Sequence, residues 1–214
     1  MYVPEHFKPD DASVRELLLN HGAVDLITAT PTGLRATMLP MIYVEPADSS
    51  ADASLGLLLG HFARKNDHWQ QPVVGEALAI VRGPDSYITP TWYATKREHG
   101  RVVPTWNYIT AHVRGELVIH EELAWVEANV RQLADKHESG RRPEWEVDDA
   151  PPAYIAGQLR AIVGVELRIS QIEAKFKLSQ NRSGADVEGV IDGLAEEQRA
   201  EMAEAVRTAA NPRR

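Results

Sequence analysis

The alternation of apolar and polar positions along the chain predicts a protein built mostly from strands. Strand-like patterns cover residues 24–28, 34–44, 55–59, 76–82, 101–119 and 164–176, with turns predicted at Gly33, Gly100 and Gly115. Helix-like patterns cover the stretch between Asp10 and Gly22 and residues 121–136, 154–161 and 195–210. Since strands and helices do not alternate regularly, the pattern predicts a mainly β protein, an antiparallel barrel with peripheral helices, rather than a doubly wound sheet.

Length and composition place the chain among ordinary globular proteins. Its 214 residues suit one domain, or one domain with a small appendage, and 43% are apolar. The absence of cysteine excludes disulfides, thiol catalysis and cysteine metal sites. The first residues lack the basic and apolar blocks of a signal peptide, and no apolar run approaches the roughly 18 residues of a membrane span. We therefore expect a cytoplasmic location.

The charge pattern bears on whether the protein contacts DNA. The formal net charge is −8, and the basic residues are scattered, apart from the pairs at 141–142 and 213–214. Nucleic-acid binders present a basic face that displaces phosphate counterions. No pair of predicted helices has the spacing of a helix-turn-helix motif with a basic second helix. The sequence therefore does not predict direct DNA binding.

Residues 60–69 bring polar and basic side chains to the end of a predicted strand. His61, Arg64, Lys65 and Asn66 crowd this point, where backbone N–H groups are often unpaired. Arginine can hold a phosphate by paired hydrogen bonds and lysine as a point charge. The alternative interpretation is a solvated turn with a positive tip, and the spacing alone leaves both open.

Two further segments mix aromatic rings with polar groups. Residues 87–93 hold three aromatic side chains, including Tyr93, and Lys96 follows them. Residues 103–108 place Thr105 and Asn107 beside Trp106. Such rings can stack on a planar ligand, and an asparagine offers a donor and an acceptor to the polar edge of such a ring. Packing over the mouth of a barrel explains the same residues without any ligand.

Together with residues 1–7 and 177–182, these segments resemble the PaiB-like family of FMN-binding negative transcriptional regulators. The resemblance extends to about residue 194. It implies an FMN-binding split β-barrel over residues 1–194, followed by a C-terminal helix and tail over residues 195–214. This fold is shared with pyridoxamine-phosphate oxidase-like flavoproteins. It also implies a homodimer with FMN at the subunit interface, whereas the DNA partner follows from the family label alone.

The resemblance also implies a set of cofactor-binding residues. Arg64, assisted by Lys65 or Asn66, would hold the FMN phosphate, and Lys177 would lie near the N1–C2=O edge of the flavin. Residues 36–40 resemble the strand whose backbone faces the flavin ring, although a histidine is more usual where Met38 stands. The complete predicted set is Thr37, Met38, Leu39, His61, Arg64, Lys65, Asn66, Tyr93, Lys96, Thr105, Trp106, Asn107, Lys177, Ser179 and Gln180.

Two other functions stay open on the sequence. One is a flavin-dependent oxidoreductase that takes electrons from a nicotinamide donor, since split barrels stack a second ring on the flavin. The other is a binding module for haem or another planar ligand, with His61 as a potential ligand. No catalytic residues can be identified, and the sequence contains no glycine-rich dinucleotide fingerprint, P-loop or zinc-type histidine pair.

Overall fold

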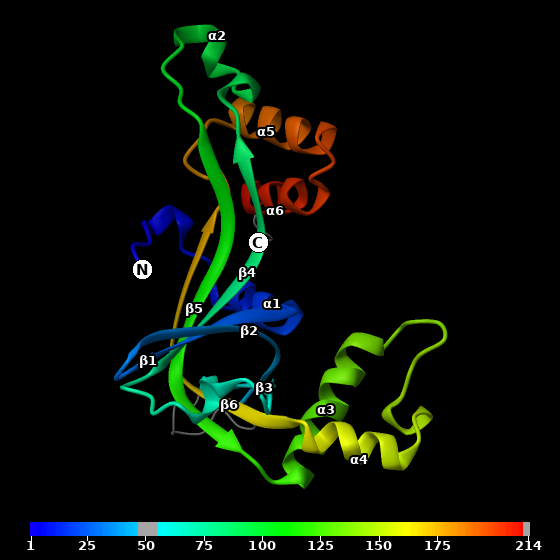
Figure 1. The fold of residues 1–214 in the computed structure, drawn as a ribbon. Helices are drawn as coiled ribbons and strands as arrows, with labels where there is room; N and C mark the ends of the chain where they lie inside the picture. Colours follow the sequence, from blue (N-terminus) through cyan, green and yellow to red (C-terminus); the bar gives the residue numbers. More distant parts are fainter. Residues whose placement is uncertain (47–54, 212–214) are drawn as a thin grey trace. The chain divides into compact units, whose positions relative to one another are not determined.

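The computed structural model describes residues 1–46 and 55–211 of the chain (Figure 1). The strands are β1 (Ala23–Thr30), β2 (Gly33–Val44), β3 (Leu57–Ala63), β4 (Ala77–Ile88), β5 (Thr105–His120) and β6 (Ile162–Lys177). The α-helices are α1 (Asp11–Asn20), α2 (Thr95–His99), α3 (Leu123–Glu138), α4 (Pro152–Arg160), α5 (Gly184–Glu196) and α6 (Ala200–Ala210). Short 3-10 helices are η1 (Glu5–Phe7), η2 (Asp67–Gln70), η3 (Pro90–Trp92) and η4 (Val147–Asp149).

The chain forms two compact units, each assembled from several segments. The barrel unit comprises Arg15–Val81 and His112–Glu173, and the terminal unit comprises Met1–Val14, Arg82–Ala111 and Ala174–Arg214. The long strands β4, β5 and β6 contribute to both units. Each unit is described by itself below.

The six strands close into a barrel in the order β1-β2-β3-β6-β5-β4. A tight turn joins β1 to β2, so that Thr30 pairs with Gly33 and the antiparallel register runs to Ala23 opposite Pro40. β1 also pairs with β4, which closes the ring. β3 pairs with β2 on one side and with β6 on the other. The predicted antiparallel barrel with peripheral helices is confirmed.

Alternate residues of the strands fill the barrel interior. In β1, the positions of Val24, Leu26, Thr28 and Thr30 are buried, and those between them are exposed or half-buried. This period of two matches the alternation that predicted the strand. Other residues with almost no exposed surface in this unit are Met41, Leu58, Phe62, Ala79, Val81, Val113, Val163, Val165 and Leu167.

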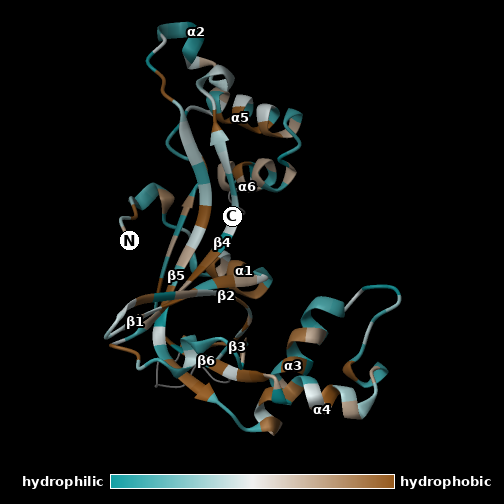
Figure 2. Ribbon diagram, in the orientation of Figure 1, coloured by the Kyte–Doolittle hydropathy of each residue, from teal (hydrophilic) through white to brown (hydrophobic). Residues whose placement is uncertain are grey.

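Helix α3 covers one outer part of the barrel. It packs on β2 and β3, where Leu133 joins Ile42 and Leu59 in a small hydrophobic cluster. Helix α4 lies beside α3, and both carry hydrophobic and hydrophilic stretches (Figure 2). An amphipathic helix of this kind derives most of its stability from burying one face. None of the helices in the described part of the chain is both long and apolar enough to cross a membrane.

In the terminal unit, α5 and α6 lie side by side and share a hydrophobic core (Figure 1). A side chain at Gly189 or Gly193 would overlap Trp92, so both positions need glycine for this close packing. The core residues are Ile88, Tyr93, Leu178, Val187, Val190, Leu194, Met202, Ala203 and Val206.

Two predictions about local structure were wrong. Gly115 is not a turn, because β5 runs through it without a break. Residues 195–210 are not one helix: they hold the end of α5, a break at Gln198 with φ of 60°, and α6. Asp10 caps α1, because its side chain accepts a 2.7 Å hydrogen bond from the backbone N–H of Ser13.

Candidate functional site

The predicted cofactor-binding residues fall into two groups, one in each unit. The barrel unit holds the set from β2, β3 and the turn after β3, namely Thr37, Met38, Leu39, His61, Arg64, Lys65 and Asn66. The terminal unit holds Tyr93, Lys96, Thr105, Trp106, Asn107, Lys177, Ser179 and Gln180.

Arg64, the predicted phosphate ligand, is anchored by the barrel unit itself. Its Nε donates to the carbonyl oxygen of Arg160 at 3.0 Å and its Nη2 to that of Ile162 at 3.1 Å. Its Nη1 forms an ion pair with Glu121 at 2.8 Å. A guanidinium has five N–H groups, so two remain for a ligand. Arg64 therefore joins β3 to the start of β6 whether or not it also contacts a phosphate.

Lys65 and Asn66 follow Arg64 but differ in their surroundings. Lys65 is exposed and forms no ion pair with any residue in the described ranges 1–46 and 55–211. Asn66 caps η2, because its Oδ1 accepts from the backbone N–H of His68 at 3.0 Å. Its Nδ2 donates to the hydroxyl of Thr37 at 3.3 Å. Of the two adjacent cations, Arg64 and Lys65, Lys65 thus has the more accessible positive charge.

His68 links two strands of the barrel and was missed by the sequence reasoning. It is 2% exposed, and its two ring nitrogens lie 2.8 Å from the hydroxyls of Thr28 on β1 and Thr37 on β2. Burial, aided by Arg35, lowers the pKa of His68, against a smaller opposite effect of Asp67. A single histidine inside a predicted turn carries no sequence signal that separates it from a surface histidine.

The remaining barrel residues of the predicted set point in different directions. Met38 is 70% exposed, whereas its neighbour Leu39 is buried, as expected for successive positions of a strand. His61 is half-buried on β3, and its Nδ1 is buried without a hydrogen-bond partner in the described chain. Burial lowers the pKa of His61, and the nearby side chain of Asn129 opposes this shift. The neutral ring is therefore favoured.

In the terminal unit, Asn107 and Ser179 form a buried polar pair. Asn107 has no exposed surface, and its Nδ2 donates to the Ser179 hydroxyl at 2.9 Å. Ser179 adopts φ of 68°, a left-handed conformation that costs energy in any residue with a Cβ. Strain of this kind is characteristic of functional sites and supports the choice of this segment.

Lys177 is fixed beside the same segment. Its Nζ donates to the Trp106 carbonyl oxygen at 2.8 Å and also to the Thr105 hydroxyl. Burial, more than the repulsion by Lys175 and Arg182, lowers the pKa of Lys177. The Trp106 ring is 48% exposed, and its Nε1 donates to Asp85 at 3.0 Å. The structure thus brings Lys177, Thr105 and Trp106 together.

Three other predicted residues of the terminal unit are less available to a ligand or lie apart. Gln180 uses its side chain within its own turn, accepting from Leu178 N and donating to Phe176 O, both at 2.7 Å. Tyr93 is 1% exposed under the Arg182 guanidinium, and burial raises the pKa of its hydroxyl. Lys96 is exposed on α2. Contact of these residues with FMN stays a prediction.

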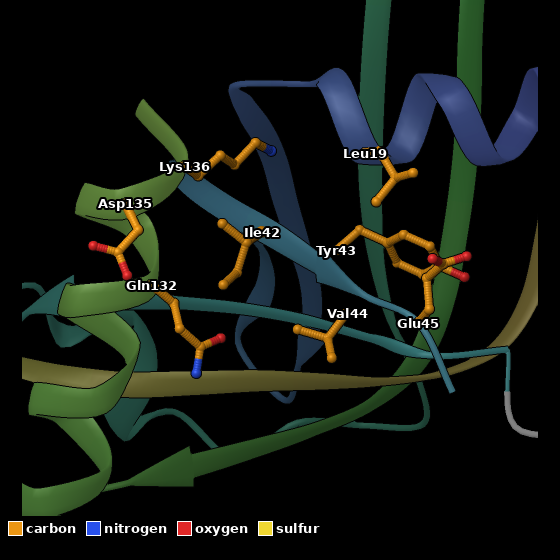
Figure 3. Close-up of a pocket in the computed structure, with 8 residues that line it drawn as sticks. All are labelled: Leu19, Ile42, Tyr43, Val44, Glu45, Gln132, Asp135 and Lys136. Atoms are coloured by element: carbon orange, nitrogen blue, oxygen red, sulfur yellow. The ribbon is translucent and has the colours of Figure 1, made fainter. Parts of the chain in front are cut away.

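A separate groove of about 470 Å³ lies on the barrel unit (Figure 3). Its apolar side chains come from α1 and β2, and polar side chains of α3 face them. Lys136 at its rim donates to the His21 carbonyl oxygen at 2.6 Å, and burial lowers the pKa of Lys136. No predicted cofactor residue is among its lining residues, which are Leu19, Ile42, Tyr43, Val44, Glu45, Gln132, Asp135 and Lys136.

The residues present fit the chemistry of FMN, which carries a phosphate and a planar ring with polar edges. In the barrel unit, Lys65 offers a cation for the phosphate and Thr37 a hydroxyl. In the terminal unit, Lys177 offers a cation for the edge of the ring and Trp106 an exposed aromatic face. When bound, FMN supplies electron transfer, and the contact of these residues with it stays a prediction. Nowhere in residues 1–46 and 55–211 do three histidine or acidic side chains cluster in a way that could hold a metal ion.

Similar proteins support the same cofactor. Residues 1–171 match the family model described as "Putative FMN-binding domain". The protease synthase and sporulation protein PAI 2 of Bacillus subtilis is 30% identical over 92% of this chain and 91% of its own length.

Solved structures with the same fold have little sequence similarity. The flavocytochrome Anf3 of Azotobacter vinelandii aligns with a TM-score of 0.57 at 13% identity, covering 82% of this chain and 68% of its own. A FAD and haem binding protein of Mycobacterium smegmatis aligns with a TM-score of 0.56 at 13% identity, covering 86% of this chain and 80% of its own. The fold is therefore the flavin-binding split barrel, and the predicted fold is confirmed. With FMN as its cofactor, the chain belongs to the PaiB-like family of FMN-binding proteins.

Proposed function

We propose that this protein is a cytoplasmic negative transcriptional regulator of the PaiB type, a homodimer that holds FMN at the subunit interface. The observation that carries the dimer is an apolar surface on the outside of the barrel unit. The regulatory role is supported by the similarity to PAI 2 and by the resemblance of the motifs to PaiB-like regulators.

The apolar surface lies across β2, β1 and β4. On β2, the outward positions are all apolar, and Leu34 is 76% and Met38 70% exposed. Directly paired residues point to the same side of a sheet, so the register extends this surface to the two neighbouring strands. We call it the outer apolar face; its apolar members are Leu34, Ala36, Met38 and Pro40 on β2, Ile27 and Ala29 on β1, and Leu78 and Ile80 on β4. The half-buried Asp25 of β1, which pairs with both Met38 and Ile80, is the one charged residue among them.

A second copy of the chain is the partner that fits this face. Contiguous exposed apolar patches mark interaction surfaces, and homodimer interfaces are more apolar than the rest of a protein surface. A two-fold dimer covers the same patch on both subunits at once. Met38 is itself one of the predicted cofactor-binding residues, so an interface at Met38 also includes a predicted FMN contact.

We expect the Leu34→Asp variant to lose the dimer. A carboxylate buried in an apolar interface costs at least about 2 kcal/mol, which raises the dimer dissociation constant about 30-fold or more. Sedimentation velocity measures the dissociation constant, and FMN absorbance measures the loss of interfacial cofactor. The control is Tyr154→Asp on α4, since Tyr154 is 59% exposed outside the outer apolar face. A monomeric wild-type protein, or a Leu34→Asp variant as dimeric as the wild type, would contradict the interface.

The regulatory role is tested on DNA at physiological salt. The formal charge of −8 disfavours direct contact with phosphates. We therefore expect repression of target genes in cells without tight operator binding by the purified dimer, through a partner protein. A reporter assay with and without the gene, together with mobility-shift titrations, measures both properties. Unchanged reporter expression on deletion would contradict the regulatory role.

We expect Lys177→Met to make the midpoint potential of bound FMN more negative. A lysine fixed near the N1–C2=O edge stabilises the negative charge of reduced flavin, so its removal disfavours reduction. A loss of about 1.4 kcal/mol corresponds to a shift on the order of 30 mV. Redox titration followed by absorbance measures it. Lys8→Met, at an exposed lysine of the same unit, is the control. An unchanged midpoint potential in Lys177→Met would contradict the proposal that Lys177 stabilises reduced flavin.

A further inference from the structure

His68 makes a short hydrogen-bonded bridge whose direction can be worked out from its partners. Its Nε2 lies 2.8 Å from the Thr28 hydroxyl and its Nδ1 lies 2.8 Å from the Thr37 hydroxyl. The ring packs against Phe62, with centroids 5.2 Å apart, and is almost completely buried. Because its pKa is lowered by burial, the ring is neutral near pH 7, with one N–H and one acceptor nitrogen. One hydroxyl therefore donates to the ring and the other accepts from it.

The burial of Thr28 decides which hydroxyl donates. Thr28 is 1% exposed, and His68 is the only hydrogen-bond partner of its hydroxyl among the described residues. If His68 Nε2 carried the proton, the hydroxyl hydrogen of Thr28 would be buried without an acceptor, and buried unpaired donors are unfavourable. With the proton on Nδ1, Thr28 donates to Nε2 and His68 donates to Thr37, so that the hydrogen left without an acceptor is on the half-buried Thr37 hydroxyl rather than on the buried Thr28 hydroxyl. The Nδ1–H tautomer is therefore the favoured one.

This tautomer determines what the Thr37 hydroxyl can do. Its oxygen then accepts from His68 Nδ1–H and from Asn66 Nδ2, the latter at 3.3 Å. A hydroxyl oxygen has two lone pairs, so both are occupied. Its hydrogen has no acceptor within residues 1–46 and 55–211, and Thr37 itself is only half-buried. The hydroxyl is left with the capacity to donate one hydrogen bond to a bound ligand and to accept none.

We infer that His68 is a positioning residue which, held as the Nδ1–H tautomer by Thr28, makes the Thr37 hydroxyl a dedicated donor to an acceptor atom of FMN. The inference rests on the proposed contact of Thr37 with FMN. It adds a specificity rule: the group of the ligand that meets Thr37 is a carbonyl or phosphate oxygen or an unprotonated ring nitrogen, and a ligand that presents a donor there is rejected.

The tautomer is tested directly in the ligand-free wild-type protein. A long-range 1H–15N correlation spectrum of the histidine rings distinguishes protonated Nδ1 from protonated Nε2, and the His68→Gln variant assigns the signal. We expect one fixed tautomer with the proton on Nδ1. A proton on Nε2, or rapid exchange between both forms, overturns the inference whether or not FMN binds.

The effect on the ligand is tested with variants at Thr28. Thr28→Val keeps the shape but removes the donor to His68, so Thr37 is no longer restricted to donating outwards. We expect FMN to bind about threefold more weakly or worse, with a changed flavin spectrum, and Thr28→Ser to restore both. Thr30→Val is the matched control, since this buried threonine of the same strand donates to the Gly33 carbonyl oxygen at 2.7 Å and not to His68.

A double-mutant cycle with Thr37→Val separates the inference from the placement of the cofactor. We expect Thr37→Val to weaken FMN binding by about three- to tenfold, and Thr28→Val to add nothing in that background. Normal FMN binding by Thr37→Val would contradict both the inference and the proposed contact. Weakened binding by Thr37→Val together with normal binding by Thr28→Val would contradict the inference alone.

Discussion

Replacing Gly115 with alanine is expected to destabilise the protein severely. Gly115 lies in the middle of β5, and a Cβ there would overlap the backbone carbonyl oxygen of Arg168 on β6. Backbone atoms of two paired strands cannot move apart without breaking the barrel, so the overlap cannot be relieved by a side-chain rotation. We expect a loss of about 3 kcal/mol or more, measured by urea unfolding followed by circular dichroism.

Gly157→Ala provides the matched control for Gly115→Ala. Gly157 lies inside α4, and a Cβ there meets nothing in its surroundings. Alanine is the better helix former, so this variant is expected to gain about 0.5–1 kcal/mol. If Gly115→Ala were as stable as the wild type, the close approach of β5 and β6 at this point would be refuted.

The barrel could be predicted because its strands repeat a local signal. In β1, the burial of every second residue is the same alternation that the sequence displays. The turn at Gly33 follows from local chemistry too, since Gly33 adopts φ of 121°, which favours glycine. Both signals lie within a few residues of the structure that they specify.

Glycines that serve tertiary packing misled the same reasoning. Gly115 was predicted to form a turn, but its role is to admit the Arg168 backbone, a contact 53 residues away in the chain. Helix α5 was missed because it contains glycines at positions 184, 189 and 193, which lower helix propensity. Two of them are required by Trp92, which no local pattern reveals. In α5, the low helix propensity of glycine was overridden by close packing against Trp92.

The candidate site shows the same division between local and distant contacts. That polar and basic residues follow β3 could be read from the sequence, and Lys65 and Arg64 both lie there. The partners of Arg64 could not be read from the sequence, because its guanidinium donates to backbone carbonyl oxygens 96 and 98 residues further along the chain. The bridge through His68 depends in the same way on strands 31 and 40 residues distant.

Replacement by methionine is expected to lower the stability of the protein at Arg64 but not at Lys65. Arg64→Met removes one ion pair and two hydrogen bonds to carbonyl oxygens, so we expect a loss of about 2–3 kcal/mol. For a chain of this size, this lowers the melting temperature by about 4–12 °C. Lys65→Met removes an exposed charge without a partner in the described chain, so stability stays within about 0.5 kcal/mol. Thermal unfolding of the two apoproteins measures this difference.

FMN affinity then assigns the phosphate contact. With Lys65 as the accessible cation, Lys65→Met is expected to raise the FMN dissociation constant about three- to tenfold, and riboflavin, which lacks the phosphate, to bind the variant and the wild type alike. An Arg64→Met protein of wild-type stability that loses FMN but not riboflavin would reverse the assignment. It would make the guanidinium a phosphate ligand first and a link between β3 and β6 second. Because the two residues are adjacent in sequence and differ mainly in their partners, the pair separates the two roles more cleanly than either variant alone.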